Sequence, residues 1–145
     1  MSLMKIKQMI LRWLPDGVVH ALRKMWYPRV VARFDENRWP PSSIARQLVK
    51  PGDCVVDAGA NIGYVTAMLA RWVGAKGKVL SFEPVPETFD LLRHNVESLR
   101  LAQVALFNGA LSSSAGEAEM NVPRYAAGYE NPYEARIVNS SAVEG

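Results

Sequence analysis

The sequence contains a single cysteine, Cys54, among 145 residues. One cysteine cannot form an internal disulfide, which excludes a disulfide-stapled secreted domain and favours a reducing compartment such as the cytoplasm. We expect Cys54 to be a small buried strand residue rather than a nucleophile. The sequence also begins without an apolar core followed by a small-residue cleavage site, so it does not predict secretion.

Several other signals are missing. No apolar run reaches the roughly 18 residues that suggest a membrane span, and no His, Cys, Asp and Glu group has the spacing of a metal site. Zinc spacing, RNP-type aromatic patterns and a helix-turn-helix pattern are absent, so we expect no nucleic-acid partner. The apolar share of 49% and charged share of 21% are those of a globular chain of about one domain.

Charge is distributed unevenly along the chain. Residues 1–50 contain ten Lys and Arg against three acids, a net charge of +7, whereas the remainder has a net charge of −4. Apolar spacing in a basic leader, residues 1–42, predicts helices over Met4–Leu14 and Val18–Met25. Their apolar stripes favour packing onto the domain or onto a second copy in a homo-oligomer. Peripheral membrane contact through the leader is the alternative.

The stretch Val55–Tyr64, with the sequence VVDAGANIGY, organises the rest of the chain. It predicts a buried strand over Cys54–Ala58, a tight turn over Gly59–Gly63 and a helix from Ile62 onward. A glycine-rich turn between a strand and a helix can expose backbone N–H groups to a ligand. Asp57 ends the strand, where open α/β sheets bind small molecules. The predicted fold class is therefore α/β.

The spacing of the glycines restricts the ligand. The dinucleotide pattern G-x-G-x-x-G fails because Asn61 stands between Gly59 and Gly63, and no P-loop pattern is present. An acid inside the motif suits a ligand with a cationic group better than a pyrophosphate. A second acid, Glu83, follows the apolar run Val79–Phe82, where a carboxylate is well placed to accept ribose hydroxyls.

Further periodic segments predict alternating helices and strands that form a parallel sheet. Ser43 is a candidate cap for a helix over Ile44–Val49. The other predicted elements are a helix with Val65, Met68, Leu69 and Trp72 on one face that ends near Gly74, a helix from Pro86 with Phe89, Leu92, Val96 and Leu99 on one face, a strand over Val104–Phe107, and a short strand over Ala118–Val122. His94 is off its helix's apolar stripe, beside polar Arg93 and Asn95, and is expected to be a surface residue. Residues 124–134 predict a loop in which Tyr125, Tyr129 and Tyr133, four residues apart, are expected to be half-buried, the alternative being that they line the mouth of a pocket.

Taken together, these motifs resemble the FkbM family of S-adenosylmethionine-dependent methyltransferases. The resemblance covers about Pro51 to Val122 and rests on DAGANIGY at 57–64, FEP-x-P at 82–86, Leu92–Asn95, and NGAL at 108–111 followed by Gly116. It implies a class I, Rossmann-like parallel sheet with flanking helices and S-adenosyl-L-methionine as cofactor. The implied cofactor-binding residues are Asp57, Gly59, Ala60, Asn61, Gly63, Tyr64, Glu83, Pro84, Asn108 and Ala110.

The resemblance also implies a role for each part of this site. The glycine turn would hold the methionine part of the cofactor, with Asp57 orienting the turn and the amino group. Glu83 would bind the ribose, and Asn108 and Ala110 would border the adenine. In this class a helix just before the first strand often lies beside the cofactor pocket.

The function implied by the resemblance is O-methyl transfer to a small-molecule, sugar or lipid hydroxyl, with no residue assigned as catalytic base. Residues 43–123 would form the cofactor-binding domain, incomplete after the third of seven strands, and residues 124–145 a loop and tail. Strand one would then have an apolar edge without a neighbour. A truncated module without catalysis is one alternative. An NAD-dependent oxidoreductase is the other, and the glycine spacing counts against it.

Overall fold

The computed structural model describes residues 14–39, 41–114, 116–121 and 136–142. The three tyrosines of the predicted loop and nearly all of the predicted Met4–Leu14 helix lie outside these residues. The chain divides into two compact units, one formed by Trp26–Leu111 and the other by Met1–Met25 with Ser112–Gly145. All residues of the predicted site belong to the first unit.

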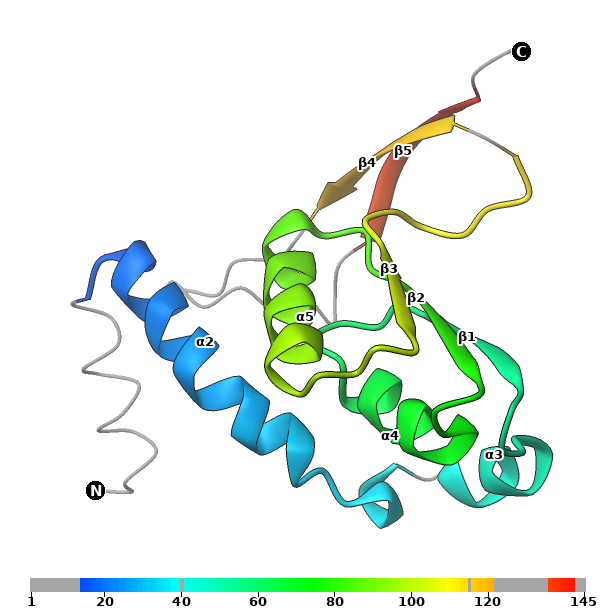
Figure 1. Cartoon of the computed structure of the whole chain (residues 1–145). Helices are drawn as coiled ribbons and strands as arrows, with labels where there is room; N and C mark the ends of the chain where they lie inside the picture. Colours follow the sequence, from blue (N-terminus) through cyan, green and yellow to red (C-terminus); the bar gives the residue numbers. More distant parts are fainter. Residues whose placement is uncertain (1–13, 40, 115, 122–135, 143–145) are drawn as a thin grey trace. The chain divides into compact units, whose positions relative to one another are not determined.

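Three parallel strands form the sheet of the Trp26–Leu111 unit (Figure 1). They are β1 (Cys54–Ala58), β2 (Lys78–Phe82) and β3 (Val104–Phe107), in the order β1-β2-β3. Helices α4 (Tyr64–Val73) and α5 (Pro86–Ser98) connect them. The alternation of strand and helix confirms the predicted Rossmann-like α/β sheet, and the strand bounds agree with the prediction to within one residue.

Helices α4 and α5 cover one face of the sheet. Met68 and Val73 of α4 are fully buried against Val79 of β2. Leu92 and Val96 of α5 pack against β3. The central strand thus lies beneath α4, and α5 closes the core beside it. The predicted apolar faces of both helices are the ones that form the core.

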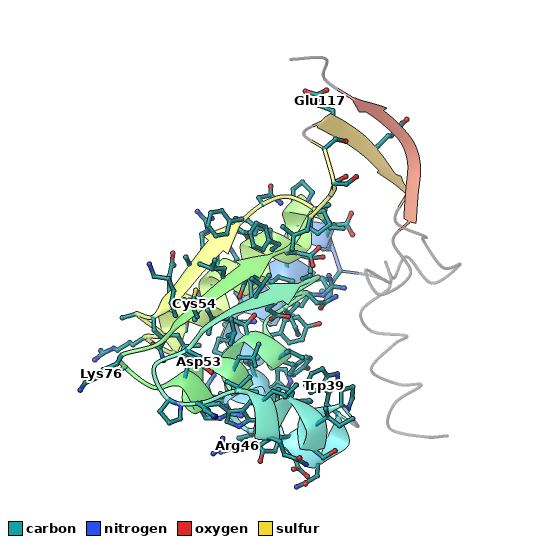
Figure 2. The ribbon with its side chains drawn as sticks, turned by 90° about the vertical axis from the view of Figure 1, so that its right-hand side faces the viewer. Trp39, Arg46, Asp53, Cys54, Lys76 and Glu117 are labelled. Carbon is teal, nitrogen blue, oxygen red and sulfur yellow. The ribbon has the colours of Figure 1, made fainter. Side chains whose placement is uncertain are left out.

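The opposite face of the sheet is open to solvent, and Figure 2 shows the strands in front of the two helices. Side chains alternate along β1, so that Asp57 points into the core while Cys54, Val56 and Ala58 are exposed. The prediction that Cys54 is buried is therefore wrong. Its position in the strand was predicted correctly, but it lies on the uncovered face.

The segment before the sheet also differs from the prediction. Helix α2 (Asp16–Ala32) extends seven residues beyond the predicted end at Met25, although Pro28 lies inside it. Val31, with 1% of its surface exposed, packs with Ile62, Ala67 and Leu91, and this burial offsets the cost of a proline in a helix. The short helix η1 (Glu36–Arg38) follows.

Helix α3 (Ser42–Leu48) begins earlier than predicted, after Pro41, and has no side-chain cap, so the assignment of Ser43 as cap is wrong. Arg46 lies over the ring of Trp72, near the carboxyl end of α4. Because α4 starts at the glycine turn and ends at Val73, these contacts place α3 at the end of α4 away from the turn. The expectation that the helix before the first strand lies beside the cofactor site is not met by α3.

The other unit contains two antiparallel strands, β4 (Gly116–Asn121) and β5 (Arg136–Ala142). Strand β4 was predicted to within two residues, whereas β5 falls in the predicted loop and tail. Its sequence, RIVNSSA, lacks a clear alternation of apolar and polar residues.

Among the described residues, no helix is both long and apolar enough to cross a membrane.

Candidate functional site

The carboxyl ends of the three parallel strands bring the predicted acids together. Ala58 of β1, Phe82 of β2 and Phe107 of β3 occupy one register position. Asp57 precedes that position, whereas Glu83 and Asn108 follow it. Residues from three separated stretches of sequence therefore lie at one edge of the sheet, as the motif spacing predicted.

Asp57 is held by the first turn of α4. Its Oδ2 accepts a hydrogen bond of 2.6 Å from the Thr66 hydroxyl, whose oxygen lies 3.1 Å from the hydroxyl of Ser81. Burial raises the pKa of Asp57 above its usual value, and hydrogen bonds from the Thr66 side chain and backbone N–H oppose the rise. The carboxylate thus already occupies the positive end of α4, where a phosphate would otherwise bind.

The N–H groups of the glycine turn point into the protein. The N–H groups of Gly59 and Ala60 both donate to the carbonyl of Phe82 at 2.9 Å. The remaining donors are likewise satisfied, Asn61 by Glu83, Ile62 by the Asn61 side chain, and Gly63 by the carbonyl of Ala60. The expectation that this turn exposes N–H groups to a ligand is therefore wrong.

The turn needs its glycines for their backbone conformation. Gly59, Asn61 and Gly63 all have positive φ, at 76°, 51° and 97°. A Cβ on Gly63 would lie 2.8 Å from a terminal carbon of the buried Leu92 side chain, so a larger residue at this position would require Leu92 of α5 to shift. Helix α4 accordingly starts at Tyr64, two residues later than predicted.

Asn95 of α5 secures the turn from the other side. Its side-chain amide donates to the carbonyl of Ile62 at 2.7 Å, and only 1% of the residue is exposed. The predicted apolar stripe of this helix does not include Asn95, and its burial was not expected. The reason is that Ile62 presents a carbonyl to α5, which the sequence of α5 alone does not reveal.

Glu83 connects the ends of the strands to the turn. One carboxylate oxygen accepts the N–H of Asn61 at 2.8 Å and the other accepts that of Val85 at 2.9 Å. Burial raises the pKa of Glu83, the two backbone hydrogen bonds lower it, and the charge of Asp57 raises it further. Each oxygen retains a lone pair, so the carboxylate can still accept hydroxyl groups.

Asn108 closes the edge of the site. Its side-chain amide donates to the carbonyls of Glu83, at 2.8 Å, and Pro84, at 3.3 Å. The ends of β2 and β3 are thereby tied together. Ala110 lies beyond them on the exposed connection after β3. Asn108 and Pro84 join the predicted cluster, whereas no hydrogen bond in the described part of the chain ties Ala110 to it.

Tyr64 packs against the segment that follows α2. Its ring centroid lies 5.0 Å from that of Phe34, which follows α2, and both rings line a cavity of about 560 Å³. The sequence patterns predicted neither this cavity nor the polar partners Thr66, Ser81 and Asn95. The roles of Thr66 and Ser81 could have been suspected, because each is a hydroxyl residue on an otherwise apolar face.

The arrangement suits a ligand that carries hydroxyls and a positive charge. It offers two buried carboxylates and no spare N–H group in the turn, so it is poorly suited to a pyrophosphate. No group of three or more metal-ligating side chains occurs among the described residues.

The model of the protein-L-isoaspartate(D-aspartate) O-methyltransferase family (PCMT) matches residues 43–142, more than half of the chain. The chain belongs to the PCMT family. The match identifies it as a relative of class I S-adenosylmethionine-dependent methyltransferases, with S-adenosylmethionine as the cofactor of the fold. The methyltransferase part of the resemblance is thus confirmed, whereas the matching family is PCMT rather than FkbM.

Individual members of the family match over part of their length. A protein-L-isoaspartate O-methyltransferase of Triticum aestivum is 32% identical over 70% of this chain and 41% of its own length. Protein-L-isoaspartate O-methyltransferase 2 of Arabidopsis thaliana is 33% identical over 65% of this chain and 28% of its own length. A solved protein-L-isoaspartate O-methyltransferase structure is 32% identical, with a TM-score of 0.45, over 48% of this chain and 23% of that one. The chain spans less than half the length of these PCMT relatives.

Proposed function

We propose that this chain supplies the S-adenosylmethionine site of an O-methyltransferase. The observation that carries the proposal is the inward orientation of the turn's N–H groups together with the two carboxylates, Asp57 and Glu83, at the strand ends. That combination disfavours a dinucleotide pyrophosphate and favours a cationic ligand with ribose hydroxyls. Membership of the PCMT family supports the same cofactor.

Every predicted residue except Tyr64 has a part in this proposal. Glu83 would accept the ribose hydroxyls with its remaining lone pairs, and the turn Gly59–Gly63 would hold the methionine part. Asp57 would fix the turn through Thr66 and attract the ligand's amino group by charge. Asn108, Pro84 and Ala110 would border the adenine.

S-Adenosylmethionine, when bound, supplies a methyl group whose bond to sulfur breaks as an acceptor oxygen attacks, the bonding electrons remaining on sulfur. Our proposal gives this chain's residues the task of positioning, which is the main requirement of such a displacement. We assign no catalytic base.

For the acceptor, we propose a carboxylate of a protein or peptide. The two PCMT relatives described above are named for L-isoaspartate in proteins, and this supports a carboxylate acceptor. A carboxylate is already ionised at neutral pH, so no base is needed to remove a proton from it. The cytoplasm, suggested by the single cysteine, would be a suitable compartment.

A second candidate is O-methyl transfer to a hydroxyl of a small molecule, sugar or lipid. The observation that favours it is the set of FkbM-like motifs, in particular the acid-containing turn and FEP-x-P. Hydroxyl acceptors need a base to take up their proton.

A non-catalytic cofactor-binding module is the third possibility, because the chain matches only part of its relatives.

Calorimetric titration with S-adenosylhomocysteine tests the proposed cofactor site. We expect saturable binding of this ligand and none of NAD. Glu83→Gln should weaken the affinity roughly tenfold or more, the effect of losing a hydrogen bond to a charged group. Glu87→Gln in the first turn of α5 removes the same charge outside the site and should leave the affinity unchanged.

Glu83 also satisfies two backbone N–H groups, so the fold of the variant must be checked by circular dichroism and thermal unfolding. The comparison of the two ligands on the unaltered chain does not depend on that check. Binding of NAD in place of S-adenosylhomocysteine, or of neither ligand by the folded chain, would refute the proposed site.

A further inference from the structure

Two fully buried hydroxyl groups lie behind Asp57. Thr66 of α4 and Ser81 of β2 have none of their surface exposed, whereas Asp57 keeps 7%. Ser81 shares a register position with Asp57 in the parallel pair of β1 and β2, so both side chains point to the same face of the sheet. Helix α4 contributes Thr66, which contacts both of them. Three elements therefore each supply one polar side chain to this hydroxyl network, formed by Asp57, Thr66 and Ser81.

The hydrogen bonds of the network have one possible direction when Asp57 is ionised. A threonine hydroxyl has one proton to donate, and an ionised carboxylate can only accept. The Thr66 hydroxyl therefore donates to Asp57 Oδ2, at 2.6 Å. The Ser81 hydroxyl lies 3.1 Å from the Thr66 oxygen and has to be the donor in that pair. The network thus runs from Ser81 through Thr66 to the carboxylate.

Packing alone does not account for the two hydroxyls. Val79 precedes Ser81 by two residues on the same face of β2 and is fully buried, and Ala67 and Met68, which follow Thr66, are buried as well. These positions belong to an apolar core that needs no hydroxyl.

The network acts on the charge of Asp57 instead. Burial raises the pKa of Asp57, and the hydroxyl and backbone N–H of Thr66 lower it. From the end of β2, the Glu83 carboxylate faces Asp57 with a charge of the same sign. The hydroxyls therefore oppose both burial and repulsion, and they favour the ionised form of Asp57.

Neither hydroxyl is accessible to a ligand, because both residues are fully buried. Asp57 keeps a small exposed area at the edge of the sheet where the cofactor is proposed to bind. An effect of Thr66 or Ser81 on the cofactor therefore has to pass through Asp57. The part of the cofactor that should respond is the amino group, which Asp57 is proposed to attract.

We infer that Thr66 and Ser81 are positioning residues that keep the Asp57 carboxylate ionised and in one orientation, so that the site selects a ligand with a cationic amino group. The inference rests on the proposed function, because it concerns the charge that attracts the methionine part of the cofactor. It makes that selection depend on two residues that do not contact the ligand.

Two ligands that differ at the amino group test the inference by calorimetric titration of the whole chain. S-Adenosylhomocysteine carries the amino group, whereas methylthioadenosine has the same adenosine and thioether without it. At neutral pH, Thr66→Val keeps the size of the side chain but removes the hydroxyl. We expect it to weaken the affinity for S-adenosylhomocysteine roughly tenfold and to leave that for methylthioadenosine unchanged. Thr66→Ser keeps the hydroxyl and should retain both affinities. Ser81→Ala should weaken only S-adenosylhomocysteine, by about threefold, because Ser81 acts through Thr66.

The protonation of Asp57 provides a second readout that needs no ligand. Removing a hydrogen bond to the ionised form raises the pKa of a carboxyl group. As the pH is lowered, Asp57 should therefore take up its proton at a higher pH in Thr66→Val and in Ser81→Ala than in the unaltered chain. The NMR chemical shift of the Asp57 carboxyl carbon measures this, and that of the Glu83 carboxyl carbon reports separately on its neighbour.

Thr88→Val and Ser42→Ala are the matched controls. They make the same changes at buried residues, 5% and 8% exposed, that are outside the hydroxyl network. Both should leave the protonation of Asp57 and the preference for S-adenosylhomocysteine unchanged.

Three results would overturn the inference while leaving the cofactor site intact: equal weakening of the two ligands, unchanged protonation of Asp57, or a loss in Thr66→Ser as large as in Thr66→Val. If Thr66→Val does not fold, Ser81→Ala decides by the same criteria, because it leaves the bond between Thr66 and Asp57 in place. Failure of the unaltered chain to bind S-adenosylhomocysteine would instead refute the proposed function and, with it, the inference.

Discussion

At the scale of single residues, the candidate site is marked by two buried carboxylates. Asp57 has 7% of its surface exposed and Glu83 has 4%. Each is held by hydrogen bonds from the turn or from α4, yet burial raises the pKa of both. The protein therefore keeps two ionisable groups in buried positions at the strand ends, as is common at functional sites.

The raised pKa of Asp57 predicts a pH-dependent difference between the chain and its Asp57→Asn variant. The native state binds this proton more tightly than the unfolded chain, whose carboxyl has the usual pKa of 3.8. The stability contributed by the protonated carboxyl is complete below that value and is lost as the pH rises through the native pKa. Asparagine does not ionise, so the stability of the variant does not show this decrease with rising pH.

We therefore expect the stability of the chain relative to Asp57→Asn to fall as the pH rises above 3.8. The fall should be about 1.4 kcal/mol per pH unit until the native pKa of Asp57 is reached, and the difference should then level off. Urea unfolding of both proteins at a series of pH values measures it. Asp16→Asn, an exposed acid of α2, is the reference for the loss of one negative charge. A difference that grows in favour of the unaltered chain as the pH rises would contradict the prediction.

At the scale of elements, the turn between β1 and α4 is fixed by its two neighbours. The carbonyl of Phe82 at the end of β2 holds Gly59 and Ala60, and α5 contacts Gly63 through Leu92. The turn thus depends on a strand and a helix that follow it in sequence.

Comparing alanine substitutions at two glycines of the turn tests that close approach. Gly63→Ala combines positive φ with a contact of 2.8 Å to Leu92, so it should lower the free energy of unfolding by roughly 2–4 kcal/mol. Gly59→Ala has positive φ but open space around its Cβ, so it should cost only about 1–2 kcal/mol. Chemical denaturation measures both. Equal losses for the two variants would show that Leu92 does not restrict the turn.

How far the sequence predicts the structure depends on whether the decisive contacts are local. Strands β1 to β3 are apolar runs bounded by glycine, proline or polar residues, and their bounds follow from these signals. The same pattern predicts that the acids Asp57 and Glu83 lie close together, because the carboxyl ends of parallel strands meet at one edge of the sheet. Local signals also predict the end of α4 at Gly74, whose φ is positive.

The parts that the sequence did not predict depend on distant residues. The direction of the turn's N–H groups is set by Phe82 and Glu83, more than twenty residues later. The burial of Asn95 depends on the carbonyl of Ile62, and the length of α2 depends on burial of Val31. The cavity beside Tyr64 is formed by α2 against a helix that starts some thirty residues later. Patterns within a segment contain none of this information.

At the scale of the whole molecule, the open face of the sheet presents a row of exposed apolar side chains. Val56 has 55% of its surface exposed and shares a register position with Leu80 and Ala105. The stacked rings of Phe82 and Phe107 occupy the next such position along that face. Among the described strands, β1 pairs with β2 alone, so its other edge has no partner there.

We expect this face and edge to cause concentration-dependent self-association. Val56→Lys should shift the chain toward the monomer in sedimentation velocity while changing its unfolding free energy little, because the residue is already half-exposed. Ile44→Lys adds the same charge at an exposed aliphatic residue of α3 and should not have this effect. A chain that is monomeric at all concentrations would contradict the expectation.

The internally satisfied turn has a consequence for how a ligand arrives. Because the backbone donors from Gly59 to Gly63 are bonded within the protein, the turn has its shape without a ligand. The conformational entropy of the turn is therefore lost when the chain folds and not when a ligand binds. The ligand then enters a preorganised site and needs no slow rearrangement of the turn. Association would be limited by diffusion and orientation, and differences in affinity between related ligands would arise from their dissociation rates.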